Sequence, residues 1–502
     1  MKEIYMKQWQ QDWISKWAVY SPDKMALKEF ESSRTLTYIE LNRCANATAY
    51  YFKNVLGLKA GESIAVLTDF NLEYCVLFSV AQKMGINIVP LNYRLASNEL
   101  NYILKEASPL LLIVESKYRQ LIEDLELYFV WTLESFIKLC EDSKSDSNIE
   151  DFPVFEVDEN DPLFILYTAG TTGHPKGVLY THKMLFWNSI NTAISLIVNS
   201  ESRTVNVMPP FHTGGWNVLL TPFLHHGGYI CVCKKFDPET TLQLLQSENV
   251  TMFMGVPTLL QMMADQASFE TAVFPDLLYL IAGGEATPIS LIEKWETKNV
   301  SIRQGYGMTE VGPNLTSLHQ EDAIRKKGSI GRPNFYVNIK LIKEDGTEAA
   351  SNEAGELWLN GPMVTPGYFN NPETTKDAFS PDGLWFKSGD IVIQDDEHYI
   401  YVVDRIKNMY VSGGENIYPA EIEKVLLQHP SIKECLVMGV KDDKWGEVGK
   451  AFIVLSFPCT KEEIIDYAKT KLGKYKIPKH IEFIESIPKS DAGKLDRKKF
   501  KN

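Results

Sequence analysis

The stretch YTAGTTGHPKGVLYTH, from Tyr167 to His182, contains three glycines, four threonines and one lysine, Lys176. It directly follows the apolar run Leu163–Leu166, which predicts a buried strand that ends at a polar loop. Glycine N–H groups can form anion-binding concavities, and a lysine adds a point charge. The loop therefore suits a polyanion, although a plain glycine-rich turn between two elements explains it equally well.

This loop differs from the common nucleotide-binding motifs. A Walker P-loop needs GxxxxGK followed by Ser or Thr, whereas Lys176 stands between proline and glycine. The Gly–Lys pairs at Lys450, Lys474 and Lys494 are followed by Ala, Tyr and Leu. The sequence also lacks GxGxxG, HExxH and GxSxG motifs. A phosphate-binding role would therefore belong to another type of loop.

Length, charge and cysteine content narrow the class of protein. The 502 residues predict about three domains or subdomains of ~150 residues each. A net charge of −14 argues against nucleic acid or an anionic membrane as the main partner. No apolar run approaches the ~18–20 residues of a membrane span, and the ends resemble neither a signal peptide nor a peroxisomal address. Seven scattered cysteines, with Cys231 and Cys233 the closest pair, favour a reduced, cytoplasmic protein over a disulfide framework or a zinc site.

Strand and helix patterns alternate along the chain. ESIAVLTD and GINIVPL predict buried strands, while LEYCVLFSVAQKMG and TTLQLLQSEN predict helices, so we expect α/β layers with parallel sheet. The acidic stretch Glu141–Pro162 predicts a surface connection. Residues 471–502 contain ten Lys or Arg against four Asp or Glu, a basic patch that charge alone explains as a solvated face.

Five further segments accompany the loop in a fixed order. They are YLIAGGEATP, RQGYGMTEVGP, WFKSGD ending at Asp390, DRIKNMYVSGGENIYPAEIE starting at Asp404, and PKSDAGKLDR. Each has a simple structural explanation taken singly: Tyr306 as core, Asp390 as a turn residue before a strand at Ile391–Ile393, and Lys494 as a surface lysine. All five in this order are very improbable by chance.

Together the segments resemble the adenylate-forming (ANL) superfamily, which includes acyl-CoA synthetases, nonribosomal-peptide adenylation domains and firefly luciferase. The resemblance covers nearly the whole chain. It is strongest to AMP-dependent fatty-acid–CoA ligases and 4-coumarate–CoA ligases, through YTAGTTGHPKGV, PPFHTGGW, QGYGMTE and GGEN. Ala169 departs from the serine usual in the family; three threonines remain in the loop, so we expect tuning rather than loss of activity.

The resemblance implies an α/β fold in two moving parts. A large N-terminal AMP-binding domain, residues 1–403, would contain two parallel β-sheet/helix layers and a distorted β-barrel. A hinge at residues 404–407 would join it to a small mobile C-terminal α+β domain, residues 408–502, with the active site in the crevice between the domains.

The implied activity is an ATP-dependent, AMP-forming acid–thiol ligation. A carboxylate would attack the α-phosphate of ATP, with Mg²⁺ present, to give acyl-AMP and pyrophosphate, and coenzyme A would then displace AMP. Two anions meet in the first step, so the site must neutralise charge. The alternatives are an adenylation enzyme that loads a carrier protein, a binding or regulatory protein without the chemistry, and a luciferase-like oxidation. The sequence does not give the oligomeric state.

By the same resemblance, the ATP-site residues divide by task. The β- and γ-phosphates would be held by Thr168, Gly170, Thr171, Thr172, Gly173 and Lys176. Tyr306 would stack on adenine and Asp390 would accept hydrogen bonds from the ribose. The remaining nucleotide contacts would come from Gly283, Gly284, Glu285, Gly307 and Arg405. Glu310 would ligate Mg²⁺, and the catalytic residues would be Lys494, Thr309 and His212.

The second half-reaction would use another face of the C-terminal domain. Rotation about Lys407 would remove Lys494 and present the segment of Ser412, Gly413 and Gly414, whose glycines leave room for the pantetheine arm of CoA. Lys474 and Lys476 would contact the phosphates of CoA.

The segment PPFHTGGWNVLL (Pro209–Leu220) would line the acyl pocket. Its candidate residues are His212, Gly214, Gly215 and Trp216, with a purely structural His212 as the other interpretation. The segment offers no acidic or basic partner for a charged substrate tail, which favours a hydrophobic acid. Medium- and long-chain fatty acids come first, and aryl or cinnamate-like acids second.

Overall fold

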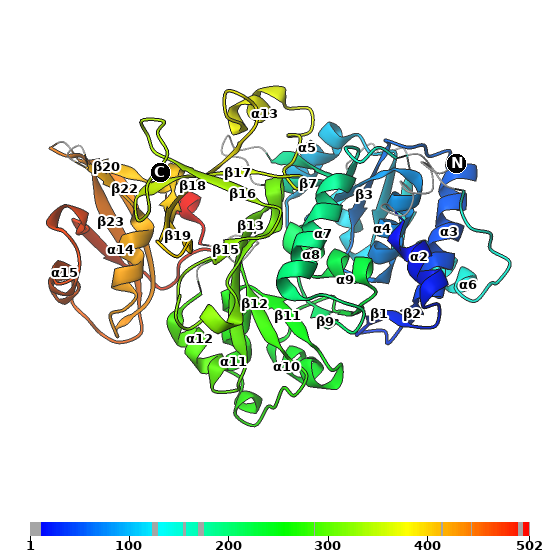
Figure 1. Ribbon diagram of the computed structural model, residues 1–502, viewed down its shortest axis with the longest axis horizontal. Helices are drawn as coiled ribbons and strands as arrows, with labels where there is room; N and C mark the ends of the chain where they lie inside the picture. The colour runs from blue at the N-terminus through cyan, green and yellow to red at the C-terminus, as the bar shows by residue number, and fades with distance from the viewer. Residues whose placement is uncertain are drawn as a thin grey trace. The chain divides into compact units, whose positions relative to one another are not determined.

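The chain folds into two compact units in the computed structural model, which describes residues 12–122, 129–153, 157–168, 175–285, 287–412, 415–442, 444–489 and 495–500. The first unit contains residues 1–328, 333–338 and 360–383, and the second contains residues 329–332, 339–359 and 384–502. Figure 1 shows the elements of both units, from blue at the N-terminus to red at the C-terminus. The predicted domain boundary, after residue 403, lies inside the second unit. These two units are not the predicted domains, whose limits stay a prediction. None of the helices described is long and apolar enough to cross a membrane.

A six-stranded sheet in the first unit carries the ends of the predicted phosphate loop. Its strands pair in parallel except for the last two, which form an antiparallel hairpin because their connection is too short for a parallel crossover. In order across the sheet they are β6 (Val130–Thr132), β5 (Leu111–Val114), β3 (Ser63–Leu67), β4 (Asn87–Pro90), β7 (Pro162–Thr168) and β8 (Lys176–Thr181).

The elements predicted from hydrophobic pattern in this region are confirmed. ESIAVLTD forms β3, GINIVPL forms β4, and LEYCVLFSVAQKMG forms the helix α4 (Leu72–Met84), in which every residue is buried. The side chain of Asn71 accepts the Tyr74 N–H at the start of α4, and Gly85, with φ +69°, ends it. These elements belong to the largest hydrophobic core of the chain.

Two further sheets complete the strands of the first unit. One has the order β2 (Thr35–Thr37), β1 (Met25–Glu29), β10 (Tyr229–Val232) and β9 (Arg203–Asn206). The other contains β11 (Met252–Gly255), β12 (Tyr279–Ala282), β13 (Ser301–Met308) and β14 (Gly312–Ser317). Strands β2 and β14 pair antiparallel to otherwise parallel neighbours. The predicted parallel layers are therefore mixed sheets, because hairpins add an antiparallel strand to each.

Helices of the first unit connect these strands. The predicted helix TTLQLLQSEN is confirmed as α10, which ends two residues earlier than predicted, at Ser247. The α-helices are α2 (Trp13–Tyr20), α3 (Tyr38–Asn54), α5 (Ser97–Ala107), α6 (Leu133–Ser143), α7 (His182–Leu196), α8 (Thr213–Asn217), α9 (Leu220–His226), α10 (Pro238–Ser247), α11 (Pro257–Ala264), α12 (Ile289–Glu296) and α13 (Pro372–Ala378). The 3₁₀ turns are η1 (Ser116–Ile122), η2 (Ala267–Glu270), η3 (Thr309–Val311) and η4 (Gln320–Asp322).

The second unit contains two sheets. The strands of the first sheet are β16 (Asn338–Ile342), β17 (Ala354–Asn360), β18 (Phe386–Gln394) and β19 (Ile400–Arg405), with β17, β18 and β19 antiparallel. The short strand β15 (Arg332–Pro333) contains one of the points at which the chain passes between units.

The second sheet of this unit has an α+β arrangement, as expected for the C-terminal part. Its helices and turns pack on the sheet and form a small hydrophobic core with it. The strands are β21 (Glu415–Ile417), β20 (Tyr410–Ser412), β23 (Gly446–Leu455) and β22 (Ile432–Asp442), with β24 (His480–Phe483) parallel to β23. The other elements are α14 (Pro419–Leu426), α15 (Lys461–Lys469), η5 (Ile406–Asn408), η6 (Lys474–Lys476) and η7 (Arg497–Phe500).

Candidate active site

The two ends of the predicted phosphate loop are fixed by the β7–β8 hairpin. Thr168 and Lys176 are register partners, and the Thr168 hydroxyl donates to the Lys176 carbonyl at 3.5 Å. A Cβ on Gly177 would lie 2.8 Å from Ile165 Cγ2, so the base of the hairpin has no room for a side chain there. The predicted loop residues Gly170, Thr171, Thr172 and Gly173 lie outside the described residues.

The end of strand β13 and the tight turn after it carry four predicted residues, Tyr306, Gly307, Thr309 and Glu310. Tyr306 pairs with Thr316 in the β13–β14 hairpin, and Thr309 and Glu310 begin η3 directly after the strand. A Cβ on Gly307 would lie 2.3 Å from the Pro313 carbonyl, so the two arms of the hairpin pass too closely for any side chain. This close passage fixes the position of the turn in which Thr309 and Glu310 stand.

The predicted adenine-lining segment follows the neighbouring strand. Strand β12 runs parallel to β13 in the register Ala282 to Gln304, so Gly283 follows β12 beside Gly305. A Cβ on Gly283 would meet the Gly305 carbonyl oxygen at 3.5 Å, and Gly284 has φ +88°. The backbone of Gly283–Glu285 and the strand that carries Tyr306 therefore lie side by side, at the carboxyl ends of two parallel strands, where α/β proteins bind ligands.

Tyr368 brings Lys176 and Glu310 together and was not among the predicted residues. The Tyr368 hydroxyl donates to Glu310 Oε1 at 3.0 Å, and Lys176 Nζ lies 5.5 Å from the centre of the Tyr368 ring. Burial, together with the nearby Glu310 carboxylate, raises the pKa of the Tyr368 phenol. The cluster thus holds a cation, a phenol donor and a carboxylate, which are groups suited to phosphates and a hard metal ion.

The second unit contains the predicted ribose carboxylate and the predicted hinge. Asp390, only 2% exposed, lies opposite Arg405 in the β18–β19 pair, and Arg405 Nε is 2.8 Å from Asp390 Oδ1. Lys407 lies in the single turn η5. The carboxylate of Asp404 accepts from the Arg405 N–H at 2.6 Å and from the Ala420 N–H at 2.8 Å, and so ties the start of α14 to this turn.

The predicted CoA residues are only partly described. Ser412 is buried and pairs with Gly446 between β20 and β23, whereas Gly413, Gly414 and Lys494, the predicted catalytic lysine, lie outside the described residues. Lys474 is exposed in η6. Lys476 is engaged by both carboxylate oxygens of a neighbouring glutamate, Glu421, at 2.7 and 2.8 Å. A phosphate would therefore have to compete with Glu421 for Lys476.

A hollow of about 550 Å³ lies beside Ser412 in the second unit. Trp445, with 42% of its surface exposed, lines it, and Lys444 Nζ and Lys479 Nζ lie 5.0 and 5.9 Å from the Trp445 rings. An exposed indole beside lysines suits a purine base that carries phosphates.

The four predicted acyl-pocket residues have different surroundings. Gly214 has room for a side chain: a Cβ there would meet Met254 Cε at 3.7 Å and Met208 Cε at 3.8 Å, which are ordinary van der Waals distances. By contrast, a Cβ on Gly215 would lie 2.3 Å from the Pro209 carbonyl oxygen. Glycine is therefore required at this position by the close approach of the backbone, and not by space for a substrate.

Trp216 and His212 differ in how deeply they are buried. Trp216 is fully buried, donates from Nε1 to the Pro210 carbonyl at 2.6 Å, and packs on Phe164 with the ring centres 4.8 Å apart. It is therefore a core residue beneath the segment. His212 is half-buried, with its ring 4.7 Å from that of Phe211.

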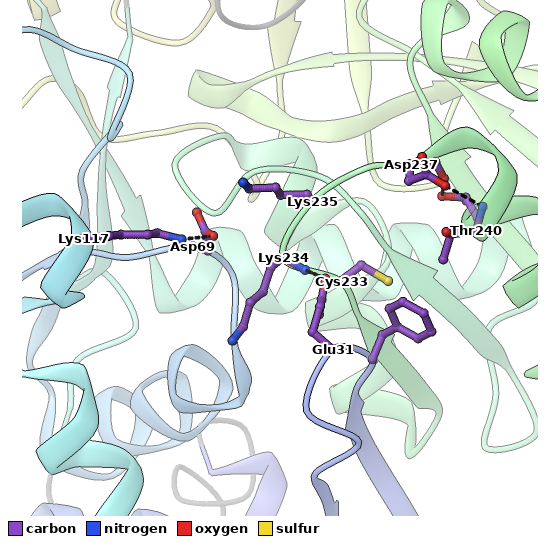
Figure 2. A pocket seen from close by; sticks show the side chains of 10 residues that line it. Glu31, Asp69, Lys117, Cys233, Lys234, Lys235, Asp237 and Thr240 are labelled. Atoms are coloured by element: carbon purple, nitrogen blue, oxygen red, sulfur yellow. Dashed lines mark hydrogen bonds and ion pairs between the residues drawn. The ribbon is translucent and has the colours of Figure 1, made fainter.

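A separate hollow of about 410 Å³ lies at the carboxyl ends of β1, β10 and β3 (Figure 2). Lys117 forms an ion pair with Asp69 there, and the Lys234 N–H donates to Glu31 at 2.8 Å. In the view of Figure 2 the side chain of Lys235 extends toward the end of the hollow occupied by Asp69. The lysines of this hollow are balanced by its acidic side chains, Glu31, Asp69 and Asp237, so its charge does not select an anion.

Two residues of interest do not follow from the sequence: Tyr368 and Trp445. Asp404 belongs to the predicted hinge, residues 404–407, but its hydrogen bond to the start of α14 does not follow from the sequence. Trp445 carried a signal, since an aromatic residue in the charged run KDDKWGE is a surface tryptophan. Tyr368 carried none, because its partner Glu310 is 58 positions away in the sequence.

Comparison with known proteins gives a consistent result over the whole chain. The family model for AMP-binding enzymes matches residues 14–369, and the model for the C-terminal domain of AMP-binding enzymes matches residues 421–494. The long-chain-fatty-acid–CoA ligase FadD13 of Mycobacterium tuberculosis is 35% identical, over 95% of this chain and 95% of its own. A feruloyl-CoA synthase of Amycolatopsis is 33% identical over 96% of both chains.

A solved structure agrees with these relatives. The o-succinylbenzoate CoA synthetase from Bacillus subtilis, in complex with an acyl-adenylate intermediate, matches with a TM-score of 0.87 and 29% identity, over 98% of both chains. The described geometry and the two family models point the same way. The chain belongs to the AMP-binding enzyme family and is one of its CoA ligases, which use ATP to convert a carboxylic acid to an acyl-adenylate and then transfer the acyl group to CoA.

Proposed function

We propose that this CoA ligase activates a hydrophobic acid, with medium- and long-chain fatty acids preferred over aryl or cinnamate-type acids. The observation that carries the proposal is the surroundings of Gly214, which faces the methyl ends of Met208 and Met254. Flexible thioether side chains adapt to an alkyl chain, and no charged side chain stands in Pro209–Leu220 to pair with a second carboxylate. The named activities of the relatives include both a fatty-acid and a ferulate ligase.

For the first half-reaction we propose the nucleotide contacts predicted from the sequence. Lys176 and the loop before it would hold the β- and γ-phosphates, and Thr309 would donate to the α-phosphate. Tyr306 and the Gly283–Glu285 backbone would hold adenine, while Asp390 and Arg405 would hold the ribose. Lys494 would bridge the substrate carboxylate and the α-phosphate, and His212 would stand at the mouth of the acyl pocket.

The surroundings of Glu310 fit a magnesium ion. Its carboxylate is a hard oxygen donor, and because Tyr368 donates to Oε1, Oε2 would be the oxygen that binds the metal ion. In ATP sites Mg²⁺ is usually held by one or two carboxylates and by the phosphates, so a single glutamate suffices. When bound, Mg²⁺ neutralises phosphate charge during adenylate formation.

We propose free CoA as the acceptor, in preference to a carrier protein. The hollow beside Ser412 offers Trp445 for the adenine ring, with Lys444 near the phosphates. Lys479 also lies beside Trp445 but forms an ion pair with Asp442 at 2.9 Å, so a phosphate would have to compete with Asp442 for it. Lys474 would add charge, and the segment of Ser412, Gly413 and Gly414 would admit the pantetheine arm. We also propose Lys407 as the hinge residue, because the single turn η5 links the two sheets of the second unit.

The cysteines bear on where the enzyme works. All seven are free thiols, and six of them are buried. This is the expected state in a reducing compartment, and we propose a cytoplasmic location on that basis.

A panel of acids tests the proposal. Purified enzyme with ATP, Mg²⁺ and CoA is given decanoate, hexadecanoate, ferulate, 2-succinylbenzoate or malonate, and AMP release is measured. We expect the highest kcat/KM with one of the two fatty acids. The highest value with malonate or 2-succinylbenzoate would refute a hydrophobic pocket. Thioester formed on a holo-carrier protein but not on CoA would refute CoA as the acceptor.

A further inference from the structure

Residues 365–369 form a strap that runs along β8 in the first unit. The Leu179 N–H donates to the Gly367 carbonyl at 3.1 Å and the Phe369 N–H donates to the Gly177 carbonyl at 2.7 Å, so Tyr368 pairs with Val178 between these two bonds. This pairing fixes the strap to the strand that begins with Lys176.

The same strap is tied to the turn that carries Glu310. The Thr365 N–H donates to the Glu310 carbonyl at 2.8 Å, and the Thr365 hydroxyl donates to the Leu179 carbonyl at 2.7 Å. The Tyr368 N–H donates to the Thr375 hydroxyl at 3.0 Å, which anchors the far side of the strap at α13. The side chain of Tyr368 is thereby held between the lysine of one element and the carboxylate of another.

We propose that Tyr368 is a positioning residue that couples the phosphate-binding lysine to the metal-binding carboxylate: its hydroxyl orients Glu310 and its ring holds Lys176. The proposal rests on the roles given to Lys176 and Glu310 under the proposed function. Two contacts carry it, the 3.0 Å hydrogen bond to Glu310 Oε1 and the 5.5 Å approach of Lys176 Nζ to the ring centre.

Each contact has a separate consequence. A donor fixed on Oε1 prevents the carboxylate from rotating and directs Oε2 to the metal; outer-shell donors of this kind commonly affect metal affinity by about 10- to 100-fold. The ring attracts the Lys176 ammonium by a cation–π interaction, which needs no hydroxyl.

A tyrosine that only fills space would explain the ring but not the hydroxyl. Two variants separate these functions: Tyr368→Phe removes the hydroxyl and keeps the ring, and Tyr368→Leu removes both. Tyr180→Phe is the matched control. It removes a fully buried hydroxyl from β8 itself, and that hydroxyl has no hydrogen-bond partner among the described residues.

The measurement is metal binding, followed by electron paramagnetic resonance. Mn²⁺ is titrated into each enzyme with saturating α,β-methylene-ATP, which cannot form an adenylate. We expect Tyr368→Phe to raise the Kd for Mn²⁺ by about 10-fold. Its Kd for the metal-free analogue should not change, because the ring still holds Lys176. In Tyr368→Leu the Kd for the metal-free analogue should also rise, by roughly 2- to 5-fold, the size of one cation–π contact. Tyr180→Phe should change neither constant.

Other outcomes overturn the proposal. An unchanged Kd for Mn²⁺ in Tyr368→Phe would do so, and so would a wild-type enzyme that binds no Mn²⁺ with the analogue. Thermal unfolding is measured alongside; a lower Tm with an unchanged Kd would make Tyr368 a packing residue. Acid-dependent pyrophosphate exchange is a separate test of the proposed function. If no acid supports exchange while the Mn²⁺ pattern holds, the coupling stands and the proposed function fails.

Discussion

Gly307 gives the sharpest test of how the turn with Thr309 and Glu310, the proposed nucleotide contacts, is held in position. An added Cβ would lie 2.3 Å from both the carbonyl carbon and the oxygen of Pro313. Carbon atoms in contact stand at least about 3.5 Å apart, so Gly307→Ala must push the hairpin open by roughly 1 Å. Overpacking of this kind costs about 1–3 kcal/mol. The same displacement moves Thr309 and Glu310, and a 1 Å misplacement of catalytic groups can reduce the rate by about 100-fold.

Gly305, two positions earlier on β13, provides the matched control. A Cβ there would meet the Thr316 carbonyl oxygen at 3.6 Å, which is ordinary contact. We therefore expect Gly305→Ala to keep its free energy of unfolding within about 1 kcal/mol of wild type, as at other glycines without strain. The free energy of unfolding is measured in urea, and kcat/KM for ATP by acid-dependent pyrophosphate exchange. If both variants behave alike in both assays, the close approach of the hairpin arms does not position this turn.

Three further predictions concern other parts of the site and the fold. Lys494→Ala should slow adenylate formation by about 100- to 1,000-fold but leave thioester formation from supplied acyl-adenylate unchanged; an equal loss in both half-reactions would contradict its role in one step. Gly214→Leu should lower kcat/KM for hexadecanoate at least about 10-fold relative to butyrate, and an equal loss with both acids would argue against a pocket at this glycine. Burial lowers the pKa of His182 to about 4 and that of His225 to about 3, whereas the unfolded chain binds these protons near pH 6.5. The stability that these two neutral histidines contribute is therefore present above that pH and is lost as the pH falls. The free energy of unfolding in urea should fall by about 2 kcal/mol per histidine between pH 7 and pH 5. His182→Phe should reduce this fall, and a variant of the exposed His398 should not.

Local pattern was sufficient to predict much of the fold. The helix α4 and the strands β3 and β4 follow from their apolar runs, because buried helices and parallel strands need apolar residues throughout. The acidic connection before β7 was also predictable, since after α6 the described residues up to 161 contain no helix or strand. The antiparallel strands at the sheet edges were not, because alternation of strands and helices indicates a parallel sheet and does not reveal a hairpin.

The residues of the site could be predicted only in part. The family resemblance carried by the ordered motifs was enough to propose Tyr306, Thr309 and Glu310, which share one strand and turn. Tyr368 depends on the pairing of the 365–369 strap with β8, which is a tertiary contact without a local pattern. Gly214 and Gly215 look alike in the sequence, yet only Gly214 has room for a Cβ, because Gly215 lies against the backbone of Pro209.

The most direct test of the central claim is to isolate the intermediate. The enzyme is mixed with ATP, Mg²⁺ and hexadecanoate without any thiol, and the products are identified by mass spectrometry before and after addition of CoA. The account predicts hexadecanoyl-AMP and pyrophosphate at first, and then hexadecanoyl-CoA and AMP. Formation of ADP and phosphate, or of thioester with no adenylate before it, would contradict it.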